Sequence, residues 1–442
     1  MTPLGVLLGL LLTLAARHTT GQDVTTHDRV VVCYFGSWAF YRPEEGKFTV
    51  DNIDPQLCTH VVYAFAGLDE TSHKIRSLDP NLDLDAGGGH GYYRKFVELK
   101  RLNPRLKVTI AVGGWNEGSK KYSDMAKDPV KRAKFINSTI DFLTTHGFDG
   151  LDLDWEYPAR RMGIPEDKQN FVKLVEELRE AYEPRGWLLT AAVAAPQSII
   201  SVSYDVPKLS KLLNYIHIMS YDYHGKWDQE TGHNAPLTGE ELSVNATLNT
   251  YLELGADPAK LVLGVPLYGR TFKLVDVDRH EVGDPTAEKA FKGPYTREDG
   301  FLGYNEMCEM RAAEPIAWTT RWDDEAKVPY VFHKNMWVSL DDEQSITNKV
   351  ELAMRYELAG AMVWTLDTDD FRGNCGTKYK LMRAINHALS TAQRGTEPPP
   401  TEPPTTPEPE PEPEEPKSTA AAAACHLPAL LALTVLSLAA RG

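Results

Sequence analysis

Short β-rich runs alternate with stretches of helical periodicity along most of the chain. Runs such as Pro129–Thr145 and Asp167–Tyr182 repeat apolar residues at helical spacing between the short runs. Strands that alternate with helices favour βα units and a parallel sheet. The pattern predicts eight strands, which are Val30–Tyr34, His60–Ala66, Lys107–Val112, Gly150–Asp154, Leu188–Ala194, Tyr215–Met219, Leu261–Val265 and Gly360–Trp364.

Eight strands are the number that a closed (β/α)8 barrel needs. The chain has 442 residues, of which 42% are hydrophobic, so it can form one large core. The stretch 271–338 is too long for a simple loop and contains short β-like pieces. A barrel of this kind places its active site at the carboxyl ends of its strands, so the chemistry is sought there.

The fourth predicted strand carries the most informative motif of the chain. Residues 148–158 read Phe-Asp-Gly-Leu-Asp-Leu-Asp-Trp-Glu-Tyr-Pro, in which apolar and acidic residues alternate. Alternate side chains of a strand share one face at a spacing of about 7 Å. The alternation therefore predicts an acidic face with Asp152, Asp154 and Glu156, and an opposite apolar face with Leu151, Leu153 and Trp155.

Three carboxylates at this spacing cannot all be ionised comfortably, so at least one should hold its proton near neutral pH. A protonated acid beside an ionised one is what acid-catalysed bond cleavage requires. The alternatives are a solvated sheet face or a cation site. The well-formed apolar side disfavours the first, and the strand alternation differs from the Gly and Asn spacing of a calcium loop.

The segment Asp149-Gly-Leu-Asp152-Leu-Asp154-Trp-Glu156 resembles the DGxDxDWE signature of family 18 glycoside hydrolases, the chitinases and their relatives. Every signature position matches, within a context that extends from about residue 30 to residue 387. The resemblance implies a (β/α)8 TIM barrel with a small α+β domain inserted between strands 7 and 8. The stretch 271–338 resembles that insertion and would form one wall of the substrate cleft.

The resemblance also implies a retaining mechanism in which the substrate's own N-acetyl group is the nucleophile. Glu156 would be the general acid and base, and Asp154 would orient the acetamido N–H and stabilise positive charge. Asp152 would share a proton with Asp154. Tyr221 would hydrogen-bond the acetamido oxygen, and Asp222 would support the distorted sugar. The implied substrate is chitin or chitooligosaccharides, whose β-1,4-linked N-acetylglucosamine units carry that group. No metal or organic cofactor is expected.

Further motifs lie at the ends of other predicted strands. Ala111-Val-Gly-Gly-Trp-Asn116 ends the third strand, with Ala111 where the family usually has serine, and Met219-Ser-Tyr221-Asp222 resembles the family's MxYD segment. Each side chain alone is compatible with simple packing, but their shared position at one barrel end favours sugar binding by flat aromatics interspersed with polar groups. The resemblance places Trp364 beneath the cleaved sugar and Trp115 on the leaving-group side. The candidate substrate-binding residues are Tyr34, Trp38, Gly114, Trp115, Asn116, Tyr157, Met219, Trp227, Tyr268, Arg270, Met362 and Trp364.

Two rival classes share this barrel. One is a chitinase-like lectin that binds chitin without turnover, although such relatives commonly lose the catalytic acid that is present here. The other is an endo-β-N-acetylglucosaminidase that acts on N-glycans. The net charge of −15 argues against nucleic acid and anionic membrane surfaces as partners, and we expect a monomer. Part of that charge is local, since seven glutamates follow Gly395 before the next positive residue, Lys417.

The N-terminal residues 1–21 read as a secretory signal peptide, cleaved between Ala16 and Gln22, because the apolar run is short and polar residues follow it. An uncleaved anchor is the alternative. Four of the five cysteines precede the tail, and oxidising surroundings favour disulfides over free thiols. The family resemblance implies the pairs Cys33–Cys58 and Cys308–Cys375. The sequons at Asn137 and Asn245 are glycosylation acceptors if exposed.

The C-terminal segment divides into two parts beyond the catalytic barrel, which we place at 22–390. Residues 395–417 are almost only Glu, Pro and Thr, a composition that cannot form a core and predicts an extended stalk. Residues 418–442 combine small residues, a spacer and a terminal apolar run, which is typical of a GPI-attachment signal, with Ser418 as the expected attachment site. A short transmembrane segment and an unstructured secreted tail are the alternatives. The expected location is extracellular, tethered to the cell surface.

Overall fold

The computed structural model describes residues 27–239 and 241–392. The predicted signal peptide, the stalk, Ser418 and the attachment signal lie outside these residues.

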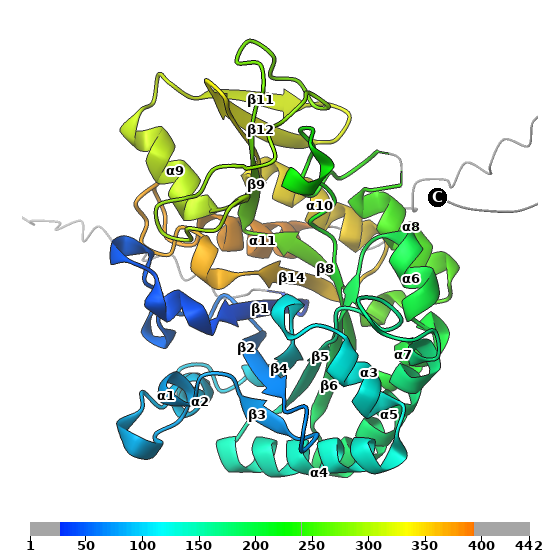
Figure 1. The fold of residues 1–442 in the computed structure, drawn as a ribbon. Helices are drawn as coiled ribbons and strands as arrows, with labels where there is room; N and C mark the ends of the chain where they lie inside the picture. The colour runs from blue at the N-terminus through cyan, green and yellow to red at the C-terminus, as the bar shows by residue number, and fades with distance from the viewer. Residues whose placement is uncertain (1–26, 240, 393–442) are drawn as a thin grey trace, which may run out of the picture. The chain divides into compact units, whose positions relative to one another are not determined.

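Eight parallel strands form a closed barrel, as the sequence predicts (Figure 1). The strand order is β1-β14-β8-β7-β6-β5-β4-β2, and β1 pairs with β2 to complete the ring. The barrel strands are β1 (Val30–Gly36), β2 (His60–Leu68), β4 (Lys107–Gly113), β5 (Gly150–Asp154), β6 (Leu188–Ala194), β7 (Tyr215–Met219), β8 (Leu261–Pro266) and β14 (Gly360–Trp364). The predicted strands begin at these same residues, and β3 (Ile75–Ser77) adds an antiparallel edge to β2.

Helices surround the barrel and cover the outer faces of its strands, except for α9, which belongs to the insertion (Figure 1). They are α1 (Pro80–Asp83), α2 (Tyr92–Glu98), α3 (Lys120–Ala126), α4 (Pro129–His146), α5 (Asp167–Tyr182), α6 (Gln197–Ser203), α7 (Val206–Leu212), α8 (Val244–Glu253), α9 (Tyr304–Ala313), α10 (Glu343–Arg355) and α11 (Lys380–Thr391). Local sequence explains the limits of α4: the Asp128 side chain caps the first turn, Pro129 occupies the first position, and Gly147 ends the helix with a φ of 76°. None of the helices in the described ranges is long and apolar enough to span a bilayer.

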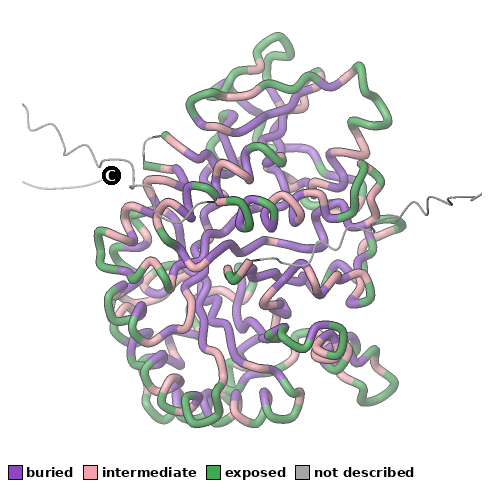
Figure 2. The backbone as a smooth tube through the Cα atoms, turned by 180° about the vertical axis from the view of Figure 1, so that it is seen from behind, coloured by how far each residue is buried: buried purple, intermediate pink, exposed green. Residues whose placement is uncertain are grey.

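The strands divide their side chains between two cores. The larger core lies between strands and helices and includes Leu151, Leu153 and Trp155. A smaller core fills the barrel interior. Figure 2 shows mostly buried backbone at the centre of the molecule, with the exposed segments around it. The predicted alternation of the fourth strand is therefore confirmed, because the apolar residues point outward to the helices and Asp152 and Asp154 are buried on the other face.

The insertion between β8 and β14 is a five-stranded antiparallel sheet with its own helix, as expected. Its strand order is β10-β9-β13-β12-β11, with β9 (Tyr268–Lys273), β10 (Phe301–Gly303), β11 (Thr319–Asp323), β12 (Val328–His333) and β13 (Met336–Ser339). Helix α9 packs beside β10, and Figure 1 shows the insertion in yellow-green above the barrel. The sheet begins at Tyr268, slightly before the predicted limit, and ends at Ser339 just beyond it.

Both expected disulfides are present. Cys33–Cys58 joins β1 to the segment before β2, and Cys308–Cys375 joins α9 to the loop after β14. The second bridge therefore fixes the insertion to the barrel. Together with Asp370 its cysteines form the one group of three potential metal ligands in the described part of the chain, but its two sulfurs are bonded to each other.

Candidate active site

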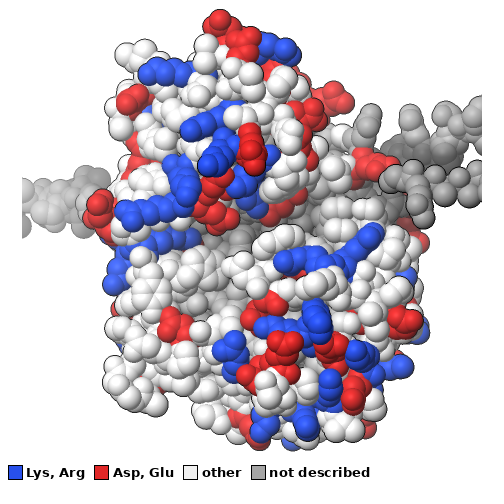
Figure 3. All heavy atoms as spheres, in the orientation of Figure 1, with Lys and Arg blue, Asp and Glu red and all other residues white. Residues whose placement is uncertain are grey.

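The candidate residues gather at the carboxyl ends of the barrel strands, beneath the insertion. They come from β1, β5, β7, β9 and β14 and from the segments that follow β1, β4, β5 and β7. Figure 3 shows the molecular surface hollowed across this face, between the insertion and the lower part of the barrel. Acidic and basic side chains are mixed around the hollow, so no single sign of charge dominates it.

The three carboxylates of the motif are all buried. Asp152 lies deepest and is held by three side chains of the barrel interior. The Tyr34 hydroxyl donates to its Oδ2 at 2.6 Å, and the Thr190 hydroxyl donates to its Oδ1 at 2.5 Å. His217 Nδ1 lies 3.2 Å from the same Oδ1 and 3.0 Å from the Tyr34 hydroxyl. These contacts fix the orientation of Asp152.

Tyr34 requires a correction. The sequence analysis placed it on an aromatic track for sugars, but its ring is only 1% exposed. Its hydroxyl serves the carboxylate cluster instead. The reason is its place within β1, where its side chain points into the barrel and not out of its mouth.

Asp154 is buried between Asp152 and Glu156, and its Oδ1 has no hydrogen bond within the described residues. Burial raises the pKa of Asp154 well above its usual range, and the charges of Glu156 and then Asp152 raise it further. Burial and the two neighbouring charges therefore favour the protonated form of Asp154. This agrees with the expectation that the three carboxylates cannot all be ionised together.

Glu156 follows β5 and closes the row of carboxylates. Burial raises the pKa of Glu156 to about 7, against smaller opposing effects of a hydrogen bond from Tyr157 and of the Arg161 charge. The Arg161 guanidinium also donates to the Glu156 and Trp115 carbonyl oxygens at 3.0 Å each. Glu156 is thus a carboxylic acid that exchanges its proton near neutral pH, as a general acid and base must.

A second cluster lies across the site around Asp222, which follows β7. Arg270 of β9 forms a two-pronged ion pair with its carboxylate, with Nε–Oδ1 and Nη2–Oδ2 distances of 2.7 Å. The Tyr268 hydroxyl donates to Oδ1 at 2.6 Å. Asp222 has a φ of 59°, and its backbone N–H donates to the buried Asn234 side chain. Residues from the barrel and from the insertion therefore hold Asp222 in one orientation.

The floor of the site is apolar. The Tyr221 hydroxyl lies 3.9 Å from the Met362 sulfur, and no stronger acceptor bonds it within the described residues. Both side chains belong to the interior core, with Met219 at its edge. Gly264 leaves the room they need, since a Cβ there would lie 3.0 Å from the Tyr221 ring. The Tyr221 hydroxyl is left available for a bound molecule.

Aromatic rings line the mouth of the barrel. Trp364 contacts Trp38 at 6.0 Å between ring centroids and stacks on Phe65 at 5.7 Å. Trp38, Trp115 and Trp227 are 42%, 58% and 52% exposed. These three tryptophans are open to solvent, whereas Trp364 is half-buried beside Trp38.

Two of these tryptophans form cation–π contacts with arginine side chains. The Arg161 guanidinium lies 3.7 Å from the Trp115 ring centroid, and that of Arg270 lies 5.2 Å from the Trp227 ring. Next to Trp115, Gly114 has a φ of 87°, and a Cβ there would meet the Phe65 ring at 2.7 Å. Glycine is required at this position for both reasons.

The remaining candidates lie at the edge of the site. Asn116 is exposed beside Trp115, and Tyr157 is half-buried beside Glu156. The sequence analysis missed several residues that the structure brings to the site, namely Phe65, Arg161, Thr190, His217 and Asn234. The strand alternation could have indicated Thr190 and His217, since each lies on a predicted strand whose neighbouring residues are apolar.

Comparisons with known proteins agree with this geometry. The model of the glycosyl hydrolases family 18 matches residues 30–369. The chain belongs to glycoside hydrolase family 18. Within this family it is 47% identical over 396 residues to probable chitinase 2 of Drosophila melanogaster, a match that covers 83% of this chain and 81% of the relative.

Two solved structures show how relatives with this family 18 fold differ in activity. The group IV chitinase of Ostrinia furnacalis, in complex with allosamidin, aligns with a TM-score of 0.80 at 45% identity, over 82% of this chain and 99% of that one. Human YKL-39, a pseudo-chitinase with retained chitooligosaccharide binding properties, aligns with a TM-score of 0.75 at 35% identity, over 82% of this chain and 100% of that one. Fold alone therefore does not establish turnover.

Proposed function

We propose that this family 18 protein is a chitinase that hydrolyses β-1,4 linkages between N-acetylglucosamine units by a retaining, substrate-assisted mechanism. The observation that carries the proposal is the pair of buried acids at the barrel mouth: Glu156, with its pKa raised to about 7, beside Asp154, whose pKa burial and its acidic neighbours also raise. A binding protein has no need of a carboxylic acid poised to exchange protons. The similarity to insect chitinases supports the same conclusion.

The geometry supports a division of roles among the residues. Glu156 protonates the glycosidic oxygen and later takes a proton from the attacking water. Asp154, whose Oδ1 lacks a partner in the described structure, hydrogen-bonds the acetamido N–H as the acetamido oxygen attacks the anomeric carbon. Asp152 takes over the proton that Asp154 holds, and so lets Asp154 become negative beside the cationic intermediate.

Tyr221 and the Asp222 cluster hold the substrate. The open Tyr221 hydroxyl donates to the acetamido oxygen and aims it at the anomeric carbon. Asp222 supports the distorted sugar, fixed in place by Arg270 and Tyr268. Trp364 lies under the cleaved sugar, while the exposed faces of Trp38, Trp115 and Trp227 take neighbouring units. Gly114, Asn116, Tyr157, Met219 and Met362 shape the remaining wall and floor.

The substrate specificity is tested with matched tetrasaccharides. We expect the protein to hydrolyse chitotetraose and to leave cellotetraose intact, because cellulose has no acetamido group to act as the nucleophile. NMR of the fresh products should show the β-anomer first, as retention requires. Binding of chitotetraose without cleavage would instead make the protein a lectin, and release of N-glycans from a high-mannose glycoprotein alone would make it an endo-β-N-acetylglucosaminidase.

We also propose that the protein acts outside the cell, where its two disulfides are stable. A signal peptide at 1–21 precedes the catalytic barrel at 22–390, and a stalk at 395–417 separates the barrel from an attachment signal at 418–442. Asn137 is exposed on α4 and suits glycosylation, whereas Asn245 is half-buried at the start of α8.

The anchor has a direct test. On cells that produce the full chain, phosphatidylinositol-specific phospholipase C should release the protein, since a GPI anchor at Ser418 joins it to lipid through a bond that this enzyme cuts. The control is a chain that ends before residue 418, which should appear in the medium without treatment. Retention on the cell after phospholipase treatment would show a membrane-spanning tail instead.

A further inference from the structure

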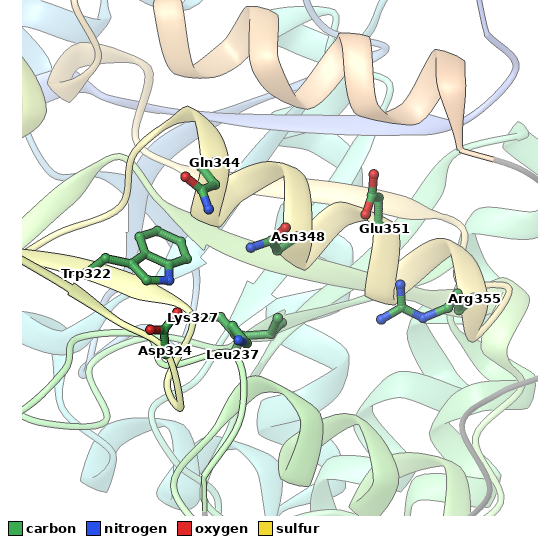
Figure 4. Close-up of a pocket in the computed structure, with 8 residues that line it drawn as sticks. All are labelled: Leu237, Trp322, Asp324, Lys327, Gln344, Asn348, Glu351 and Arg355. Carbon is green, nitrogen blue, oxygen red and sulfur yellow. The ribbon is translucent and has the colours of Figure 1, made fainter.

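A groove outside the barrel lies between helix α10 and the β11–β12 hairpin of the insertion (Figure 4). Its volume is 380 Å³, and none of the residues that line it belongs to the candidate active site. Such a volume is at the small end of ligand pockets and suits one or two sugar rings. The groove is therefore a second place where a small ligand can lie.

One wall of the groove is aromatic. Trp322 of β11 is half-buried, and Figure 4 shows its ring facing the space in front of α10. Within the described residues the Trp322 ring stacks on no other ring, and its indole N–H has no hydrogen bond. A flat ring that is free on one side can pack against the apolar C–H face of a pyranose.

The opposite wall is polar. Gln344, Asn348, Glu351 and Arg355 recur at i, i+4, i+7 and i+11, so they share one face of α10. None of these four side chains forms a hydrogen bond or an ion pair with the other described residues. In Figure 4 the Asn348 amide points from α10 toward Trp322. Amides both donate and accept hydrogen bonds, as the hydroxyl and N-acetyl groups of a sugar require.

We propose that this groove binds N-acetylglucosamine units through Trp322 and the amides of Gln344 and Asn348, separately from the catalytic cleft. The combination of a free indole face with an unpaired amide pair favours a sugar over a charged ligand. Two acidic side chains, Asp324 and Glu351, and two basic ones, Lys327 and Arg355, line the groove, so it lacks the excess of one sign that an anion or a cation would need.

Two sources can supply such a sugar. One is a chitin chain whose other units occupy the cleft or lie free. The other is a glycan on Asn245, which is next to the groove: the Asn245 backbone N–H donates to the carbonyl of the lining residue Leu237 at 3.0 Å, and its side chain accepts from Tyr356, the neighbour of Arg355. Both sources would present N-acetylglucosamine units to the groove, and an experiment can distinguish them.

The test compares Trp322→Ala with Trp322→Phe in the full chain. We expect Trp322→Ala to lose about tenfold in affinity for insoluble chitin, the usual effect of truncating one buried aromatic contact, while Trp322→Phe keeps most of it. Hydrolysis of soluble chitotetraose should stay unchanged in both, because Trp322 is outside the cleft. The control is Ile316→Ala, an almost fully exposed apolar residue of the insertion that does not line the groove.

Adding Asn245→Gln, which removes the glycosylation site, distinguishes the two sources of the bound sugar. If the groove takes chitin from solution, the loss in Trp322→Ala is the same with and without the glycan. If it takes the attached glycan, Trp322→Ala lowers the melting temperature of the glycosylated protein only, and chitin affinity does not change. The double variant Gln344→Ala, Asn348→Ala provides the same readouts should Trp322→Ala fold poorly. Unchanged chitin affinity together with an unchanged melting temperature in both glycosylation states would overturn the proposal.

Discussion

Glu156→Gln should lower the rate of chitotetraose hydrolysis by roughly 10³-fold, in the range that a general acid contributes. Glutamine keeps the size and hydrogen-bonding shape of the protonated acid but has no proton to give to the leaving oxygen. Binding should persist, since Trp38, Trp115 and Trp364 are unaffected. The measurement is the rate of product release beside a direct binding titration of the same oligosaccharide. Glu166→Gln, an exposed residue of the following loop, is the control and should keep full activity.

The pH dependence of the wild-type protein checks the same role. Burial raises the pKa of Glu156 to about 7, so its protonated fraction falls about tenfold for each pH unit above that value. The rate should therefore decline along a basic limb with a midpoint near pH 7. A rate that stays constant to pH 9, or a Glu156→Gln variant that turns over at the wild-type rate, would assign the acid to another residue.

Glu156→Gln should raise the stability at high pH although it lowers the activity. A carboxyl whose pKa is raised on folding contributes stability that is complete below its unfolded pKa, near 4.5, and that is lost as the pH rises through 7. Glutamine does not ionise, so Glu156→Gln should be up to about 3 kcal/mol more stable than the wild type at pH 8 and equal to it at pH 4. The ionised carboxylate, which cannot act as the acid, is therefore the form that destabilises the fold.

Much of the architecture was predictable because it depends on local periodicity. A strand buried on both faces still alternates its side chains, and Asp152 and Asp154 reveal that alternation because their neighbours Leu151 and Leu153 are apolar. The first residues of the eight barrel strands and both ends of α5 followed from pattern alone. Disulfide connectivity did not follow from the pattern. Four cysteines allow three pairings, and only the family resemblance selected the observed one.

The contacts that complete the site depend on tertiary structure that no local pattern contains. The ion pair of Arg270 with Asp222 joins the insertion to the barrel across 48 positions, and Tyr34 reaches Asp152 across 118. Tyr34 is also where sequence reasoning was wrong, since an aromatic near a strand end can face either the cleft or the barrel interior. No local pattern marks Trp322 as a binding residue, because its place in the groove depends on helix α10 opposite it.

Asp154→Asn should lower kcat by roughly 10²-fold, with a smaller change in KM. Asparagine fills the same space, but it cannot pass a proton to Asp152 and so cannot become negative when positive charge develops on the sugar. Separate measurements of kcat and KM for chitotetraose would distinguish a slower chemical step from weaker binding. An Asp154→Asn variant with the wild-type kcat would remove Asp154 from the mechanism and leave its raised pKa as a consequence of burial alone.

Thermal unfolding of this variant tests the protonation state independently of activity. Since burial and two neighbouring acids raise the pKa of Asp154, its favourable contribution to stability is present at low pH and lost as the pH rises toward the raised value. Asp154→Asn should therefore melt at a higher temperature than the wild type at pH 8, and the gain should vanish near pH 4.

Asp124→Asn provides a control of opposite sign. Hydrogen bonds from Lys120 and Lys127 lower the pKa of Asp124 to about 2, so its contribution is present above its unfolded pKa and is lost as the pH falls through 2. This variant should melt lower than the wild type at neutral pH, with a difference that narrows in acid. If Asp154→Asn behaved like Asp124→Asn, Asp154 would be ionised in the folded protein, and the proton that the mechanism passes between Asp152 and Asp154 would have to be held elsewhere in the cluster.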